Sequence, residues 1–306
     1  MKKLIAIAFT ALILTSCKKA KKEQTEHSPT SDFVEIRNTD YELVKPAKNT
    51  GRVLVLFGGY PEDAEDIKRE FNILEGAKQK DIAVLFMNYN QKLWLQEDEK
   101  QQLAAQLLKI FKDHKLPDAN AYFGGFSSGG NVALLISDYL TEKQSSLIPK
   151  GVFIVDSPID LVALYKSSEK NIARNFSEVS VQESTWLLKT LGDQFGNPEN
   201  TVLAYQKYAV YTSRTETIDN IKNLKNTKLR LYTEPDTLWW KENRRADYDQ
   251  MNAYYLERLS KTLKKSGFDQ VTYIPTKNKG YRADGTRHPH SWAIVDPEEL
   301  IHWILE

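Results

Sequence analysis

The residues with the clearest chemical potential lie in one glycine-rich stretch near the middle of the chain. Residues 124–130 read GGFSSGG and follow the mostly apolar run 119–123, ANAYF. No register of the stretch supplies the G-x-G-x-x-G of a dinucleotide-binding turn, and Gly130 is followed by Asn131 rather than by the lysine of a phosphate-binding loop. The glycines therefore need another explanation.

The stretch contains a G-x-S-x-G pentapeptide, Gly125-Phe126-Ser127-Ser128-Gly129. On a sharp turn from strand to helix, this pattern holds its central serine in strained backbone, and the flanking glycines let the strand and the helix cross closely. Such a turn presents the serine hydroxyl above the carboxyl edge of a parallel sheet, where open α/β folds bind ligands. The pattern therefore predicts a nucleophilic serine at Ser127.

A serine hydroxyl needs a base within hydrogen-bonding reach. Of the five histidines, His27 lies in a polar N-terminal segment, His114 at the end of a predicted helix and His302 in the predicted terminal helix. His288 and His290 remain, in the loop TRHPHSW that follows the last predicted strand. We prefer His290 as the base, because the proline between the two restricts His288 to extended backbone. The alternative role for His288 is to line the cleft.

The elements that must position these residues follow a regular alternation. Apolar runs typical of buried strands occupy residues 53–57, 82–87, 119–123, 152–155, 228–232 and 270–275, and helical patterns occupy 64–80, 97–114, 131–140, 248–265 and 298–305. This order predicts an α/β fold with a mostly parallel central sheet and helices on both faces. Residues 161–226 interrupt it with helical patterns alone, which predicts an insertion or lid over one end of the sheet.

Together these features resemble the α/β-hydrolase family, from about residue 53 to the C-terminus. In that family the nucleophile, the acid and the base follow in the chain order Ser, Asp or Glu, His. The resemblance implies Asp236 as the acid, because residues 233–236 (TEPD) take the place of the family's Gly-x-x-Asp-like turn. Glu234 is the near alternative. Asp156 is another, since some family members place the acid one strand earlier.

Acyl transfer also needs hydrogen-bond donors aimed at the developing oxyanion. The resemblance implies that the backbone N–H of Ser128 is one of them. The second would come from the loop 58–61, GGYP, which follows the first strand and looks like the family's His-Gly-Gly loop with Phe57 in the histidine position. Gly59 or Tyr60 would then supply the second N–H.

The implied reaction is the transfer of an acyl group from a small-molecule ester or peptide to water, with no metal or organic cofactor. Esters are the first expectation, and a peptidase or an acyltransferase of the same fold is the alternative. A non-catalytic binding lipoprotein on the same fold is a further alternative. The net charge of +1 gives no indication of a nucleic-acid partner.

The N-terminus predicts a lipid anchor. A positive start, MKK, precedes the apolar residues 4–14, a stretch too short to span a bilayer. It closes with LTSC, which resembles the lipobox of bacterial lipoproteins, and Cys17 is the sole cysteine. We therefore expect a signal peptide over 1–16, a lipidated Cys17 with a flexible tether over 17–32, and a hydrolase domain over 33–306. The protein would be held at a membrane of the bacterial cell envelope, facing the periplasm.

Overall fold

The computed structural model describes residues 24–26, 32–48, 50–89 and 91–306. Cys17 and the predicted signal peptide lie outside the described residues, as does His27. Within them, no helix is long and apolar enough to cross a membrane.

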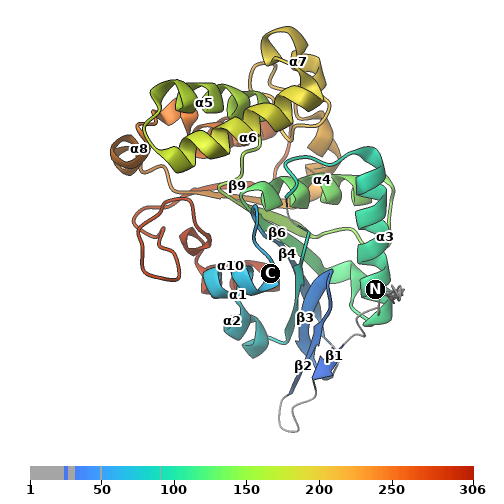
Figure 1. Cartoon of the computed structure of the whole chain (residues 1–306). Coiled ribbons are helices and arrows are strands. Elements are labelled where there is room, and N and C mark those ends of the chain that lie inside the picture. Colours follow the sequence, from blue (N-terminus) through green and yellow to red (C-terminus); the bar gives the residue numbers. More distant parts are fainter. Residues whose placement is uncertain (1–23, 27–31, 49, 90) are drawn as a thin grey trace, which may run out of the picture.

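The centre of the molecule is a nine-stranded sheet in the order β1-β2-β3-β5-β4-β6-β7-β8-β9 (Figure 1). The six strands from β5 to β9 in this order are parallel, and β1, β2 and β3 are antiparallel to their neighbours. The strands are β1 (Gln24–Glu26), β2 (Phe33–Arg37), β3 (Tyr41–Pro46), β4 (Arg52–Phe57), β5 (Ile82–Met87), β6 (Ala121–Phe126), β7 (Gly151–Val155), β8 (Lys228–Thr233) and β9 (Val271–Pro275). The predicted mostly parallel α/β fold is confirmed.

The antiparallel edge is a feature that the sequence pattern did not predict. β2 reads FVEIR and β3 reads YELVKP, so charged residues interrupt the apolar runs. Edge strands with one solvated face carry this kind of pattern, whereas fully buried parallel strands are continuously apolar. β1 pairs with β2 and falls inside the predicted tether, so a part of that segment extends the sheet.

Helices cover both faces of the sheet (Figure 1). α3 (Glu97–Asp113), α4 (Ser128–Glu142) and α9 (Asn252–Lys265) pack on one face, while α1 (Ala64–Glu70), α2 (Leu74–Gln79) and α10 (Pro297–Leu305) pack on the other. The single helix predicted over 64–80 is two helices, because the chain becomes extended at Phe71. The Phe71 ring stacks on Trp292, with 4.6 Å between the ring centroids, so tertiary packing overrides the local helical pattern.

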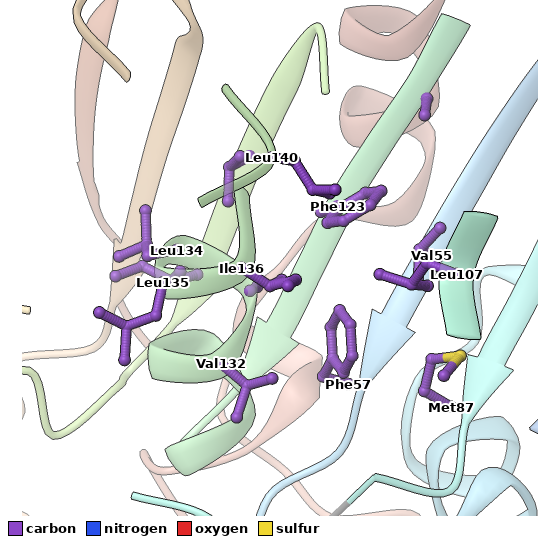
Figure 2. Packing of buried hydrophobic residues seen from close by; sticks show 14 of the residues in the cluster. Val55, Phe57, Met87, Leu107, Phe123, Val132, Leu134, Leu135, Ile136 and Leu140 are labelled. Carbon is purple, nitrogen blue, oxygen red and sulfur yellow. The ribbon is translucent and has the colours of Figure 1, made fainter. Parts of the chain in front are cut away.

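The core beneath α3 and α4 fixes the two strands that carry the candidate site (Figure 2). Phe57 at the end of β4 and Phe123 in β6 are fully buried, with their ring centroids 6.2 Å apart. Val132 of α4 packs in the same cluster. Each buried side chain of this size contributes about 1.5–3 kcal/mol, so the ends of β4 and β6 are held firmly against each other.

The region between β7 and β8 forms a separate helical layer. It contains α5 (Leu161–Arg174), α6 (Glu178–Phe195) and α7 (Pro198–Gln206), which lie together beyond one end of the sheet (Figure 1). These helices share a small core of their own, formed by Leu161, Val162, Leu191, Phe195, Tyr205 and Ala209. The short helix α8 (Thr237–Arg244) follows β8 and lies near this layer.

Candidate active site

Ser127 occupies a strained turn between β6 and α4. Its backbone angles are φ 51° and ψ −127°, a conformation that side chains rarely adopt. A Cβ at Gly125 would lie 2.2 Å from the carbonyl oxygen of Gly129, and a Cβ at Gly129 would lie 2.3 Å from that of Phe57. Neither distance is tolerable, so both glycines are needed for the strand and the helix to cross at this turn.

Two loops meet at Ser127. A Cβ at Gly59, in the loop after β4, would lie 3.1 Å from the Ser127 Cβ, so this loop approaches the serine directly. On another side, the ring of Phe126 packs against the His290 imidazole, with 4.5 Å between centroids. The structure therefore places the loop predicted to bind the oxyanion beside Ser127, and the preferred histidine against Phe126, the residue that precedes it.

The His290 ring is oriented by Asp156, which follows β7. Its Nδ1 lies 2.6 Å from Oδ2 of Asp156. Asp156 is 5% exposed and has a positive φ of 45°, and its Oδ1 accepts a hydrogen bond from the Thr233 hydroxyl at 2.6 Å. The Asn252 side chain donates to the Asp156 carbonyl oxygen at 2.7 Å. The carboxylate is thus held on both oxygens, and one of them faces the imidazole.

The structure corrects the predicted partner of the histidine. Asp236 does not contact the His290 ring. Its carboxylate accepts from Arg287 Nη2 at 2.6 Å and from the Trp239 backbone N–H at 3.0 Å, where it caps the N-terminus of α8. Only a short turn separates β8 from α8. The Asp236 side chain therefore serves as the N-cap of this helix. Asp156 follows β7, which is the immediate neighbour of β6 and so lies nearer to the serine.

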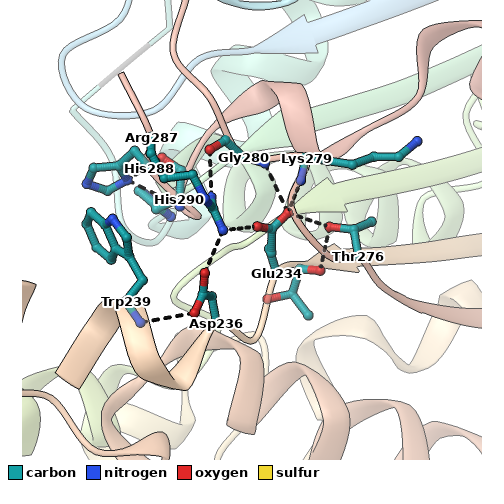
Figure 3. A network of polar contacts seen from close by, with 10 residues as sticks. Glu234, Asp236, Trp239, Thr276, Lys279, Gly280, Arg287, His288 and His290 are labelled. Carbon is teal, nitrogen blue, oxygen red and sulfur yellow. Dashed lines mark hydrogen bonds and ion pairs between the residues drawn. The ribbon is translucent and has the colours of Figure 1, made fainter. Parts of the chain in front are cut away.

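Glu234 is the other carboxylate considered after β8. It binds several residues of the loop that carries His290 (Figure 3). Its side chain is 1% exposed and forms an ion pair with Arg287. Its Oε2 accepts from the backbone N–H groups of Lys279 and Gly280, at 2.8 and 3.0 Å, and from the Thr276 hydroxyl at 3.2 Å. Glu234 therefore holds the loop that carries His290, without contacting the imidazole.

His288 lies beside His290 in an aromatic setting. Its ring meets Trp239 edge-on, with 4.7 Å between centroids, and Trp240 at 6.0 Å. Its Nδ1 lies 3.0 Å from the His290 carbonyl oxygen. Burial, together with nearby positive charge, lowers the pKa of His288 to about 3, so the ring stays neutral at physiological pH. His288 therefore packs between the tryptophans of α8 and His290, and its alternative role of lining the cleft stays a prediction.

The other two described histidines lie in contacts of their own. His114 Nε2 is 2.6 Å from the Tyr41 hydroxyl, and His302 forms an exposed ion pair with Glu306. Both contacts agree with setting these residues aside as candidate bases.

The loop after β4 contains a carboxylate that the sequence analysis did not single out. Glu62 Oε2 accepts from the Gly59 N–H at 2.9 Å and from the Trp292 indole N–H at 3.1 Å. Burial raises the pKa of Glu62. The Gly59 N–H is therefore engaged, so the role of second oxyanion donor stays a prediction for Tyr60. Ser128 begins α4, where an amide has no acceptor within the helix.

The hydroxyl of Ser127 makes no hydrogen bond to a histidine in the described part of the chain. In hydrolases without substrate, such bonds are often long and tighten only when substrate binds. Around this turn lie a histidine whose Nδ1 is oriented by a buried carboxylate and the backbone amide of Ser128 at the start of α4. This set of groups can transfer a proton from a hydroxyl and stabilise a developing oxyanion.

The helical layer reaches the site at Tyr60. The Tyr60 ring lies against Trp186 of α6, with 5.0 Å between centroids, and both side chains are partly exposed. A pocket of about 330 Å³ adjoins this contact, lined by Trp94 and Trp186 together with Gln91, Lys92, Leu93, Gln96, Glu99, Thr190 and Gln194. The predicted insertion thus contacts the loop after β4 through Trp186 and lines this pocket.

No family model and no curated protein matches the chain. Solved structures do match. An esterase from the fungus Rhizomucor miehei aligns at 15% identity over 93% of this chain and 80% of its own, with a TM-score of 0.53. Carboxyl esterase 2 from the fungus Tuber melanosporum aligns at 14% identity over 94% and 87%, with a TM-score of 0.52. An esterase from the bacterial hormone-sensitive lipase family aligns at 15% identity over 93% and 83%, with a TM-score of 0.52.

These identities are low, so the likeness concerns the fold. The sheet order, the flanking helices and the matches together show that this chain has an α/β-hydrolase-like fold.

Proposed function

We propose that this protein is a serine hydrolase, most readily an esterase, with Ser127, His290 and Asp156 as its catalytic triad. The observation that carries the proposal is the strained Ser127 turn packed beside an imidazole whose Nδ1 lies 2.6 Å from a buried carboxylate. Strain at a single non-glycine residue persists where the surrounding structure enforces it, and such residues cluster at active sites.

The mechanism follows from the positions of these groups. His290 Nε2 takes the proton of Ser127 Oγ while the oxygen attacks the carbonyl carbon, and Asp156 stabilises the imidazolium that forms. The backbone N–H groups of Ser128 and Tyr60 bind the oxyanion. The imidazolium then gives its proton to the leaving alcohol as the ester bond breaks. Water attacks the acyl-serine with His290 as base, which releases the acid and restores the serine.

Esters are the proposed substrates because the matched structures are described as esterases. A peptidase or an acyltransferase would use the same triad, and only substrate assays separate them. We also propose that Cys17 carries a lipid that holds the protein at the bacterial cell envelope, on the strength of its LTSC motif.

The test is labelling of the full-length protein in detergent with a fluorophosphonate, which reacts with activated serines. We compare the wild type, Ser127→Ala and the matched control Ser128→Ala, which keeps the backbone N–H of residue 128. The expected result is an adduct on Ser127 that S127A loses and S128A retains, with hydrolysis of 4-nitrophenyl butyrate at least about 10³-fold lower in S127A. A folded wild type that neither forms an adduct nor hydrolyses the ester would support the binding-protein alternative.

A further inference from the structure

Beside the candidate histidine, Arg244 carries a positive charge that forms no ion pair with a carboxylate of the described residues. We propose that Arg244, assisted by Arg282, forms an anion-binding subsite next to His290, and that the preferred substrates are esters whose acyl or alcohol part carries a carboxylate. This inference rests on the proposed hydrolase function and names its substrate class.

Arg244 is connected to the site through a chain of aromatic contacts. Its guanidinium lies over the Trp239 ring, 5.6 Å from the centroid. Trp239 in turn meets the edge of His288, and the rings of His288 and His290 are 6.2 Å apart between centroids. Two aromatic rings therefore lie between the guanidinium and the imidazole, so an anion bound by Arg244 would belong to a part of the substrate remote from the ester carbonyl.

The charge of Arg244 is available to a ligand. Within the described chain, Arg244 has no carboxylate at ion-pair distance, and its guanidinium donates only to the carbonyl oxygen of the adjacent Asn243, at 3.1 Å. Its helix, α8, buries none of its residues. Arginine binds carboxylates with two parallel hydrogen bonds, and stacking on an aromatic ring orders the guanidinium in advance.

The two carboxylates that follow β8 are already neutralised. Glu234 and Asp236 both pair with Arg287, on the inner side of the histidine loop. Arg282 also has no ion pair in the described chain, although its charge interacts with the carboxylate of Asp284. The charges of Arg244 and Arg282 both help to keep His288 neutral. An incoming carboxylate would therefore meet the Arg244 guanidinium beside an uncharged aromatic wall.

Arg245 offers a matched control. It follows Arg244 directly and also lacks a carboxylate partner within the described residues, but its guanidinium lies over the Phe176 ring, 5.0 Å from the centroid. It thus faces the helical layer rather than His288. Removing either arginine changes the net charge equally, so only a local effect distinguishes the two variants.

The experiment measures kcat/KM for pairs of esters that differ in one carboxylate. On the acyl side, mono-4-nitrophenyl succinate is compared with 4-nitrophenyl butyrate, and the adipate half-ester with the hexanoate. On the alcohol side, 4-acetoxybenzoate is compared with phenyl acetate. The full-length wild type, Arg244→Gln, Arg282→Gln and Arg245→Gln are assayed at low and high salt.

We expect at least one anionic ester to be preferred over its neutral partner. Arg244→Gln should lower that preference about 10-fold, as the loss of a charge-assisted hydrogen bond predicts, with little change for the neutral ester. Arg282→Gln should lower it less, and Arg245→Gln should leave it unchanged. The pair that shows the preference identifies the side of the ester on which the carboxylate lies.

Equal rates for all pairs, or an equal loss in Arg244→Gln and Arg245→Gln, would overturn the subsite while leaving ester hydrolysis intact. If no ester is cleaved, binding of mono-4-nitrophenyl succinate to Ser127→Ala by calorimetry decides the question independently. Binding that weakens with Arg244→Gln supports the subsite, and an absence of binding overturns it.

Discussion

The turns after β7 and β8 lie next to each other at the same edge of the sheet, and both present carboxylates, but they hold them differently. Asp156, after β7, receives a neutral hydroxyl on one oxygen and faces the His290 ring with the other. Glu234 and Asp236, after β8, both face the guanidinium of Arg287 (Figure 3).

The difference shows what a catalytic carboxylate requires. A carboxylate paired with a guanidinium already has its charge compensated, so it contributes little to stabilising a cation on a neighbouring imidazole. Asp156 is surrounded by neutral donors, and its charge remains available to the histidine. The turn after β7 is thus suited to chemistry, and the turn after β8 is suited to holding the histidine loop in place.

Asp156→Asn should produce the largest effect. The amide cannot stabilise the imidazolium and favours the wrong tautomer of His290, so kcat for 4-nitrophenyl butyrate should fall by about 10⁴-fold, as the equivalent change does in serine proteases. Stability should change little, because the Thr233 hydroxyl can still donate to the amide oxygen. Steady-state kinetics and thermal unfolding measure the two effects. A loss below about 10-fold would mean that another group orients His290.

Much of this comparison could be predicted from the sequence. The Ser127 turn is encoded locally, since two glycines at fixed spacing between a strand and a helix satisfy a steric need that the structure confirms. The parallel strands are encoded by continuous apolar runs. His290 could be proposed as the base because the sequence has few histidines, and His288 and His290 are the two in the loop after the last strand.

The partner of His290 could not be fixed in the same way. Asp156 and Asp236 both follow buried strands, and no local pattern states which carboxylate an arginine fifty residues away will neutralise. The tertiary contact between Arg287 and Asp236 determines that Asp236 is neutralised and Asp156 is not. The contact between Glu62 and Trp292 was missed for a similar reason, since the two residues are remote in sequence.

The ion pair between Glu234, in the turn after β8, and Arg287 should contribute chiefly to stability. Glu234→Gln removes a buried charge while Arg287 keeps the Asp236 carboxylate. The expected cost is therefore that of lost charge-assisted hydrogen bonds, about 1.5–3 kcal/mol. Denaturant unfolding should show this loss. Activity should fall through displacement of the histidine loop, and fluorophosphonate labelling should slow in parallel.

The control for this change is Glu299→Gln, which breaks the ion pair between Glu299 and Arg230. The Glu299 side chain is 50% exposed. Solvent screens a pair of that kind, so its loss should cost about 1 kcal/mol or less. Equal costs for the two variants would contradict the anchoring role of Glu234.

Asp236→Asn should have the smallest effect, although Asp236 was the sequence-based choice for the acid. Asparagine caps helix N-termini as well as aspartate does, so the Trp239 N–H keeps its acceptor. Arg287 retains the Glu234 carboxylate and the Gly280 carbonyl oxygen, which it contacts at 2.6 Å. We expect kcat within about threefold of the wild type and a change in unfolding free energy of about 1 kcal/mol or less.

The same kinetics and denaturant unfolding serve as the measurement. The control is Asp236→Ala, which loses both the helix cap and the ion pair, whereas Asp236→Asn loses the ion pair alone. If Asp236→Asn lost as much activity as Asp156→Asn, the two turns would not differ in function, because His290 would then depend on both carboxylates during turnover.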